Sequence, residues 1–82
     1  MPAQRLKVRV IHPDRVMFEG EADFVMAPGT KGSLGIFPTH TPLYAELVAG
    51  EVHIQGDKEE TFALEGGIIK VRNDEVTILL GL

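Results

Sequence analysis

Hydrophobic and polar residues alternate along much of this chain, and the alternation predicts β-strands. The clearest case is residues 5–11, in which Leu6, Val8 and Val10 alternate with charged residues. A period of two residues is typical of a strand with one buried face. Similar alternating or short apolar stretches predict further strands at 16–18, 22–27, 43–48, 51–55, 61–65, 68–72 and 75–80.

Turn-forming residues separate the predicted strands. His12-Pro13-Asp14 and Gly56-Asp57-Lys58 are turn sequences, and Asn73-Asp74 predicts a tight hairpin before the last strand. Ala49-Gly50 and Gly66-Gly67 are expected to end the strands before them. Because no stretch repeats apolar residues at helical spacing, we expect one all-β domain over residues 1–82. Its predicted form is a flattened antiparallel β-sandwich or barrel of about eight to ten short strands.

The segment from Pro28 to Tyr44 combines three glycines with three prolines and is predicted to be a loop that holds one shape. The glycines permit positive φ, whereas the prolines fix φ and bias the residue before them toward extended backbone. We expect Gly29, Pro38 and Pro42 to set this shape. An apolar group inside the segment, Leu34, Ile36 and Phe37, fits two alternatives: an exposed binding surface, or a plug for one end of the sandwich.

Composition narrows the classes of function. The chain has 82 residues, no cysteine and a net charge of −4. These values argue against a disulfide framework and against binding to a phosphate backbone. The chain has no apolar run near the ~18 residues that cross a bilayer. We therefore expect no nucleic-acid partner and no direct membrane insertion.

Candidate chemical sites are few. His12, His40 and His53 lack metal-ligand spacing, and Ser33 is not in a G-x-S-x-G motif. The glycine spacing also departs from both phosphate-binding loop patterns. We expect no catalytic residue, no metal and no cofactor.

Protein binding is the function that the remaining features favour. Thr39 to Tyr44 offers polar and aromatic groups of the kind found at interfaces, and Gly66-Gly67 leaves room for another backbone to approach. One alternative is a free-standing adaptor that binds peptides by adding them to a sheet edge, with no requirement for Gly35 or His40. A small hydrolase or ligand-binding barrel is another.

Several stretches resemble the epsilon subunit of the rotary F-type ATP synthase, and they follow in order along nearly the whole chain. The most specific is Gly32-Ser33-Leu34-Gly35-Ile36-Phe37-Pro38-Thr39-His40-Thr41-Pro42-Leu43. The others are Phe18 to Ala22, Pro28-Gly29, Leu47 to Gly50, Gly66-Gly67 and Val76 to Leu79.

The resemblance implies a non-catalytic subunit of the central stalk, which turns with the gamma subunit and couples rotation and proton transport to ATP synthesis. Carried over by position, Lys31, Gly32, Ser33, Leu34 and Gly35 would face the membrane c-type ring. His12, His40 and Ala45 would face gamma. The resemblance also implies a peripheral location at the cytoplasmic face of the bacterial inner membrane.

Three features depart from the family pattern. Ser33 stands where many members carry glutamate, and neighbouring Lys31 brings the opposite charge. His12 stands where a small hydroxyl residue is expected. The C-terminal helical hairpin of the family does not follow Leu82, so we expect no helical domain in this chain.

Overall fold

Alternating burial along the strands gives this protein one apolar core. In the computed structural model, which describes residues 5–39 and 42–81, Leu6, Val8 and Val10 are buried while Lys7 and Arg9 between them are exposed. The same alternation recurs in the other strands, and no polar or charged residue of the described part is buried. The described residues contain no helix, and hence none that could span a bilayer.

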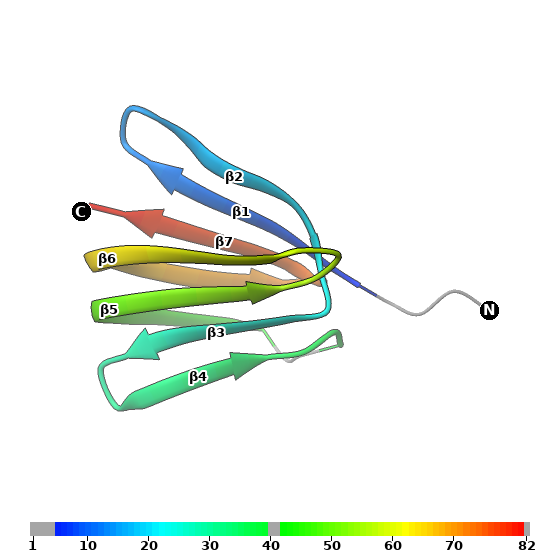
Figure 1. The fold of residues 1–82 in the computed structure, drawn as a ribbon. Helices are drawn as coiled ribbons and strands as arrows, with labels where there is room; N and C mark the ends of the chain where they lie inside the picture. Colours follow the sequence, from blue (N-terminus) through cyan, green and yellow to red (C-terminus); the bar gives the residue numbers. More distant parts are fainter. Residues whose placement is uncertain (1–4, 40–41, 82) are drawn as a thin grey trace.

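Seven strands form a single sheet in the order β2-β1-β7-β6-β5-β3-β4 (Figure 1). Neighbouring strands run antiparallel except β1 and β7, which are parallel. The strands are β1 (Leu6–His12), β2 (Arg15–Ala22), β3 (Phe24–Gly29), β4 (Gly32–Ile36), β5 (Leu43–Gln55), β6 (Glu59–Arg72) and β7 (Glu75–Leu80).

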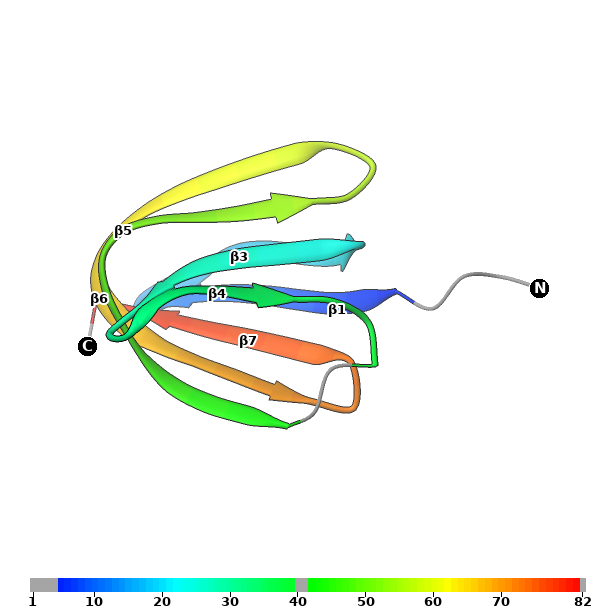
Figure 2. The same ribbon diagram turned by 90° about the horizontal axis from the view of Figure 1, so that it is seen from below.

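The sheet folds over itself because β5 and β6 are long and bent. Figure 2 shows both strands curving from one layer into the other. The first half of β5 pairs with the second half of β6, which continues to β7, β1 and β2. The second half of β5 pairs with the first half of β6 and with β3, which continues to β4. The two layers enclose the core, so the predicted all-β sandwich is confirmed.

Two predicted strand ends are wrong, because β5 and β6 are longer than predicted. Neither Ala49-Gly50 nor Gly66-Gly67 ends a strand, because β5 and β6 continue through both sites and bend there. Each long strand therefore replaces two predicted short ones. The predicted hairpin at Asn73-Asp74 is confirmed: both residues have positive φ, and Arg72 pairs with Glu75, as in a two-residue type I′ turn.

Gly67 meets another backbone, as predicted for the Gly66-Gly67 site. A Cβ atom at Gly67 would lie 2.2 Å from the carbonyl oxygen of Leu79 in β7. The approaching backbone belongs to this chain's own sheet. The site is therefore occupied internally and is not an open surface for a partner.

We predict that Gly67→Ala lowers the free energy of unfolding by about 3 kcal/mol, because the new methyl group must push β7 away from β6. Thermal unfolding followed by circular dichroism measures the change, expected as a fall of at least about 10 °C in Tm. Gly20→Ala is the matched control, since its Cβ meets only the tip of the Phe18 ring, at 3.2 Å. Equal losses in the two variants would contradict this explanation.

Candidate functional site

The segment predicted as a loop is mostly a β-hairpin. Residues 24–29 form β3 and residues 32–36 form β4, with Thr30-Lys31 as the turn between them. The loop prediction for Pro28 to Tyr44 is therefore wrong for most of its length. The prediction failed because glycine, although it has no side chain, still pairs with a neighbouring strand through its backbone, as Gly35 does with Met26.

Two glycines allow the tight turn. A Cβ at Gly29 would lie 2.9 Å from the carbonyl oxygen of Gly32, so a side chain has no room there. Gly32 has a φ of +122°, a value that residues with side chains rarely adopt. The turn presents exposed Lys31 at the end of the sandwich where β5 and β6 bend (Figure 1).

The apolar group in this segment divides between core and surface. Ile36 is 1% exposed and belongs to the core, whereas Leu34 is half-buried against it. Phe37 is 60% exposed, and its ring lies 4.6 Å from that of Phe24, centroid to centroid. Ile36 therefore fills the end of the sandwich, as one alternative predicted, whereas Phe37 is part of an exposed surface, as the other predicted.

The connection from β4 to β5 contains three of the predicted residues. Pro38 is half-buried and Pro42 is exposed, immediately before β5. The backbone N–H of Thr39 donates to a carboxylate oxygen of Asp74 at 2.6 Å, which ties this connection to the hairpin between β6 and β7. His40, predicted to face gamma, lies outside the described residues.

A groove of about 540 Å³ lies between the β3–β4 hairpin and the first half of β5. Its floor is apolar, because Leu34, Leu43 and Ala45 are all half-buried against the core. The groove is lined by Gly29, Thr30, Lys31, Leu34, Leu43, Tyr44, Ala45 and Glu46. Residues predicted to face the ring (Lys31, Leu34) and one predicted to face gamma (Ala45) thus meet in one groove.

Glu46 was not predicted as part of a site. The alternation over residues 43–48 was a signal for it, since Tyr44 and Glu46 share the exposed face of the strand. Tyr44 is 68% exposed. The groove therefore combines an apolar floor with one cationic and one anionic group, Lys31 and Glu46, among its lining residues. An arrangement of this kind suits protein contact.

His12 lies apart from Ala45, in a second hollow of about 270 Å³ lined by His12, Met17, Ala63, Leu64, Glu65, Leu80 and Gly81. Its Nδ1 atom is buried without a hydrogen-bond partner among the described residues, and it lies 3.9 Å from a carboxylate oxygen of Asp14. The predicted gamma-facing residues in the described part therefore occupy two separate hollows.

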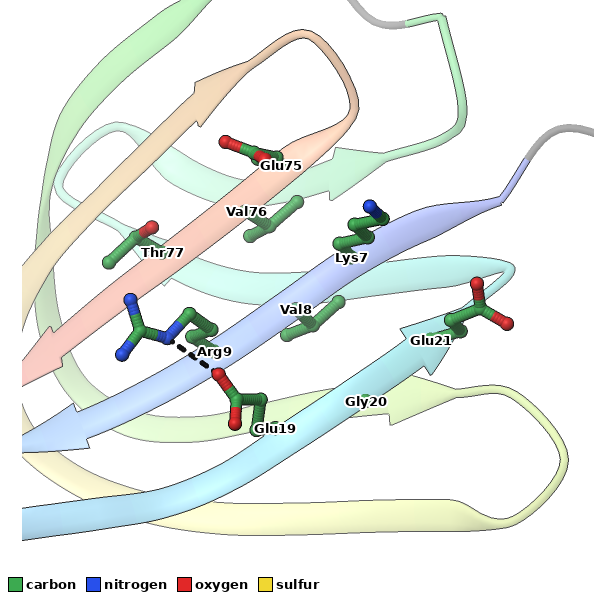
Figure 3. Close-up of a pocket in the computed structure, with 9 residues that line it drawn as sticks. All are labelled: Lys7, Val8, Arg9, Glu19, Gly20, Glu21, Glu75, Val76 and Thr77. Atoms are coloured by element: carbon green, nitrogen blue, oxygen red, sulfur yellow. Dashed lines mark ion pairs between the residues drawn. The ribbon is translucent and has the colours of Figure 1, made fainter.

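A third hollow, of about 420 Å³, lies on the outer face of β1, β2 and β7 (Figure 3). Lys7 pairs in register with both Glu21 and Glu75, and Arg9 contacts Glu19 at 3.0 Å. Cross-strand pairs of opposite charge stabilise a sheet. The hollow therefore has three carboxylates, Glu19, Glu21 and Glu75, against two cations, Lys7 and Arg9, and the cross-strand pairs compensate most of this charge.

Arg5 joins three acidic residues at the opposite end of the sandwich from Lys31. Its guanidinium lies 3.0 Å from Asp23, 3.4 Å from Asp57 and 3.6 Å from Glu21. Partial burial would lower the pKa of Arg5, but these carboxylates outweigh it, and the net shift of the pKa is upward. Three exposed acidic residues, Glu19, Glu21 and Asp23, thus form ion pairs with arginines: Glu19 with Arg9, and the other two with Arg5.

In the described ranges, 5–39 and 42–81, we find no cluster of three or more metal-ligating side chains. The groove beside the β3–β4 hairpin contains no histidine among its lining residues, and its one carboxylate is Glu46. Its chemistry is that of a binding surface: an apolar floor, an exposed tyrosine and two charged groups.

Comparison with known proteins indicates the family of this chain. Residues 5–81 match the family described as the beta-sandwich domain of the ATP synthase Delta/Epsilon chain. An ATP synthase epsilon chain of Leptospira interrogans is 39% identical over 80 residues, which cover 96% of this chain and 63% of the relative. The ATP synthase epsilon chain of Brevibacillus brevis is 44% identical over 77 residues, which cover 92% of this chain and 58% of that relative. The chain thus spans about three fifths of these relatives.

Solved structures support the fold at low sequence identity. A chain in the Euglena gracilis mitochondrial ATP synthase superposes with a TM-score of 0.88 at 15% identity, covering 95% of this chain and 51% of that one. A chain in the structure of the central stalk and c-ring of the Tetrahymena thermophila mitochondrial ATP synthase superposes with a TM-score of 0.81 at 18% identity. The match covers 98% of this chain and 66% of that one. From the match over residues 5–81, the chain belongs to the family of the ATP synthase delta/epsilon chain β-sandwich domain.

Proposed function

We propose that this chain is a rotor component of the central stalk of an F-type ATP synthase. In this role it binds the gamma subunit and the loops of the c-type ring and couples their rotation to ATP synthesis. It performs no reaction of its own and lies peripherally at the cytoplasmic face of the bacterial inner membrane. The relatives named ATP synthase epsilon chain support this role.

The observation that carries the proposal is the groove beside the β3–β4 hairpin. It joins Lys31, at an exposed turn, to the apolar floor formed by Leu34 and Ala45. A rotor component between two partners needs adjoining surfaces of different character. The exposed turn suits polar ring loops, and the apolar floor suits a packed contact with gamma.

The body of the domain suits mechanical transmission. Its core is apolar and continuous across both layers, and close-packed interiors resist deformation. A stable contact covers about 800 Å² on each partner, whereas the free chain exposes 5308 Å². Binding of the partners is therefore expected to add to the apparent stability of the domain by mass action.

We predict that Gly35→Val weakens binding to the gamma subunit of the same organism at least tenfold. A Cβ at Gly35 already lies 3.3 Å from the Phe24 ring, so the larger side chain displaces the Phe24–Phe37 pair. Pull-down and titration calorimetry measure the binding, with Tm as the check on folding.

His53→Ala is the matched control for that variant. His53 and Gly35 are both in register with Met26, on opposite sides of it. We expect His53→Ala to keep full affinity for gamma. If both variants bind gamma as well as the unchanged chain does, the Phe24–Phe37 pair does not contribute to the gamma contact. If the unchanged chain does not bind gamma, the free-standing adaptor becomes the better description.

We also predict that Lys31→Glu weakens association with a purified gamma–ring complex about fivefold, the effect of about 1 kcal/mol from one exposed charge. Lys58→Glu is the control, because Lys58 is an exposed lysine in the β5–β6 turn at the other end of the sandwich (Figure 1). Sedimentation at low and high salt measures the association. Equal effects of the two charge reversals would count against a ring contact at the β3–β4 turn.

A further inference from the structure

The two layers of the sandwich are joined differently at their two ends. At one end, β5 and β6 run from one layer into the other through their bends (Figure 2). At the other end, the connections from β2 to β3 and from β4 to β5 cross between the layers, and the β5–β6 turn lies beside the first of them (Figure 1). Contacts between these segments decide whether this second end stays closed.

Backbone contacts bring the β2–β3 connection onto the β5–β6 turn. The N–H of Asp23 donates to the carbonyl oxygen of Gln55 at 2.7 Å. A Cβ at Gly56 would lie 2.8 Å from the carbonyl oxygen of Glu21, so a side chain has no room there. The N–H of Gly56 donates to the carbonyl oxygen of Lys58 at 3.2 Å, which closes the turn. The two layers therefore meet backbone to backbone at this corner.

Arg5 lies over this corner and pairs with both layers. It directly precedes β1 in one layer, and its guanidinium contacts Asp57 on the turn of the other layer at 3.4 Å. The same guanidinium contacts Glu21 on β2 and Asp23 on the connection. Its Nη2 atom also packs against Gly56, 3.4 Å from where a Cβ would stand. These four charged residues, Arg5, Glu21, Asp23 and Asp57, form the Arg5 cluster.

The link between Arg5 and Asp57 depends on charge. The Nη2 atom that faces Asp57 is buried and has no hydrogen-bond partner among the described residues. The side chain of Asp57 is 91% exposed, and that of Asp23 is 64% exposed. Dissolved salt screens ion pairs that are this open to water. The strength of the cluster is therefore expected to fall as the salt concentration rises.

The apolar core begins directly beneath the Arg5 cluster. Leu6, Ala22 and Ile54 are each at most 1% exposed. Leu6 follows Arg5 along the chain, Ala22 lies between two acidic members of the cluster, and Ile54 leads into the β5–β6 turn. Separation of the layers at this corner would bring these three side chains into contact with water.

From these contacts we infer that the Arg5 cluster is an electrostatic clasp. It holds the two layers together at the end away from the bend, and this end opens locally when the clasp is weakened. The bend stays closed, because β5 and β6 are continuous there and keep their own ladder. Different parts of one protein open with different free energies. Every group of the clasp belongs to this chain, so the clasp operates whichever partner the domain binds.

Arg9 offers a matched comparison for Arg5. Its ion pair with Glu19 has the same length, 3.0 Å, as that of Arg5 with Asp23. Arg9 and Glu19 are cross-strand neighbours within one layer, however. Loss of this pair removes one charge contact of the same kind without releasing any link between the layers.

The test compares amide hydrogen exchange in Arg5→Met and Arg9→Met, since methionine keeps an unbranched apolar side chain and removes the charge. We expect Arg5→Met to speed exchange at the amides of Asp23 and Gly56 at least fivefold, as loss of several ion pairs should. Exchange at Ile69, in the ladder between β6 and β7, should stay within twofold. Arg9→Met should leave the Asp23 and Gly56 amides within twofold.

Salt provides a second measurement, on the unchanged chain, that does not depend on how a variant folds. Raising sodium chloride from about 0.1 M to about 1 M shortens the range of charge interactions from about 10 Å to about 3 Å. We expect exchange at Asp23 and Gly56 to speed up relative to that at Ile69. Arg5→Met should lack this response, because its clasp is already absent.

Three results would overturn the clasp. Equal exchange at Asp23 and Gly56 in the two variants would mean that Arg5 has no special role between the layers. Acceleration of the same size at Ile69 in Arg5→Met would mean that Arg5 stabilises the whole fold and not one end. If Arg5→Met does not fold, the salt experiment decides, and an unchanged ratio of exchange rates in the unchanged chain would contradict the clasp.

Discussion

The pairing of β5 with β6 along their full lengths is the interaction on which the rest of the structure depends. The ladder runs from Leu43 opposite Val71 to Gln55 opposite Glu59, and both layers of the sandwich are attached to it. The strands bend where Val48 pairs with Gly66 and Gly50 with Leu64. A side chain at Gly50 would meet Pro28 at 3.2 Å, so the bend also determines how closely β3 can pack. The position of the β3–β4 hairpin, and hence of the groove, follows from this ladder.

Local patterns were sufficient to predict most of the strands, because a strand with one buried face has the same period wherever it lies. Asn73-Asp74 was predictable for a similar reason, since a two-residue turn depends on the conformations that its own residues allow. The bends in β5 and β6 were not predictable in this way. The dipeptides Ala49-Gly50 and Gly66-Gly67 are compatible with the end of a strand or with a bend, and only the partner strand decides between them. The parallel pairing of β1 with β7 likewise depends on contacts between residues about seventy positions apart.

The candidate site shows the same division between local and distant information. Lys31 and Leu34 belong to one hairpin, so their proximity follows from three residues of separation. Lys31 and Leu34 share a groove with Ala45 only because β4 faces the first half of β5 on the open side of the sandwich. His12 was grouped with Ala45 by resemblance, but it ends β1 and lines the hollow with Leu80 and Gly81. Sequence could indicate which residues suit contact, whereas the order of strands decides which of them share a surface.

The mechanical role that we propose would give physical meaning to the continuity of the sheet. The sheet is one continuous ladder from β4 through β3, β5, β6, β7 and β1 to β2. A force applied at the β3–β4 hairpin would be carried by backbone hydrogen bonds through both layers. At the opposite edge of the sheet, the charged side chains of β2 would keep that strand from pairing with other chains.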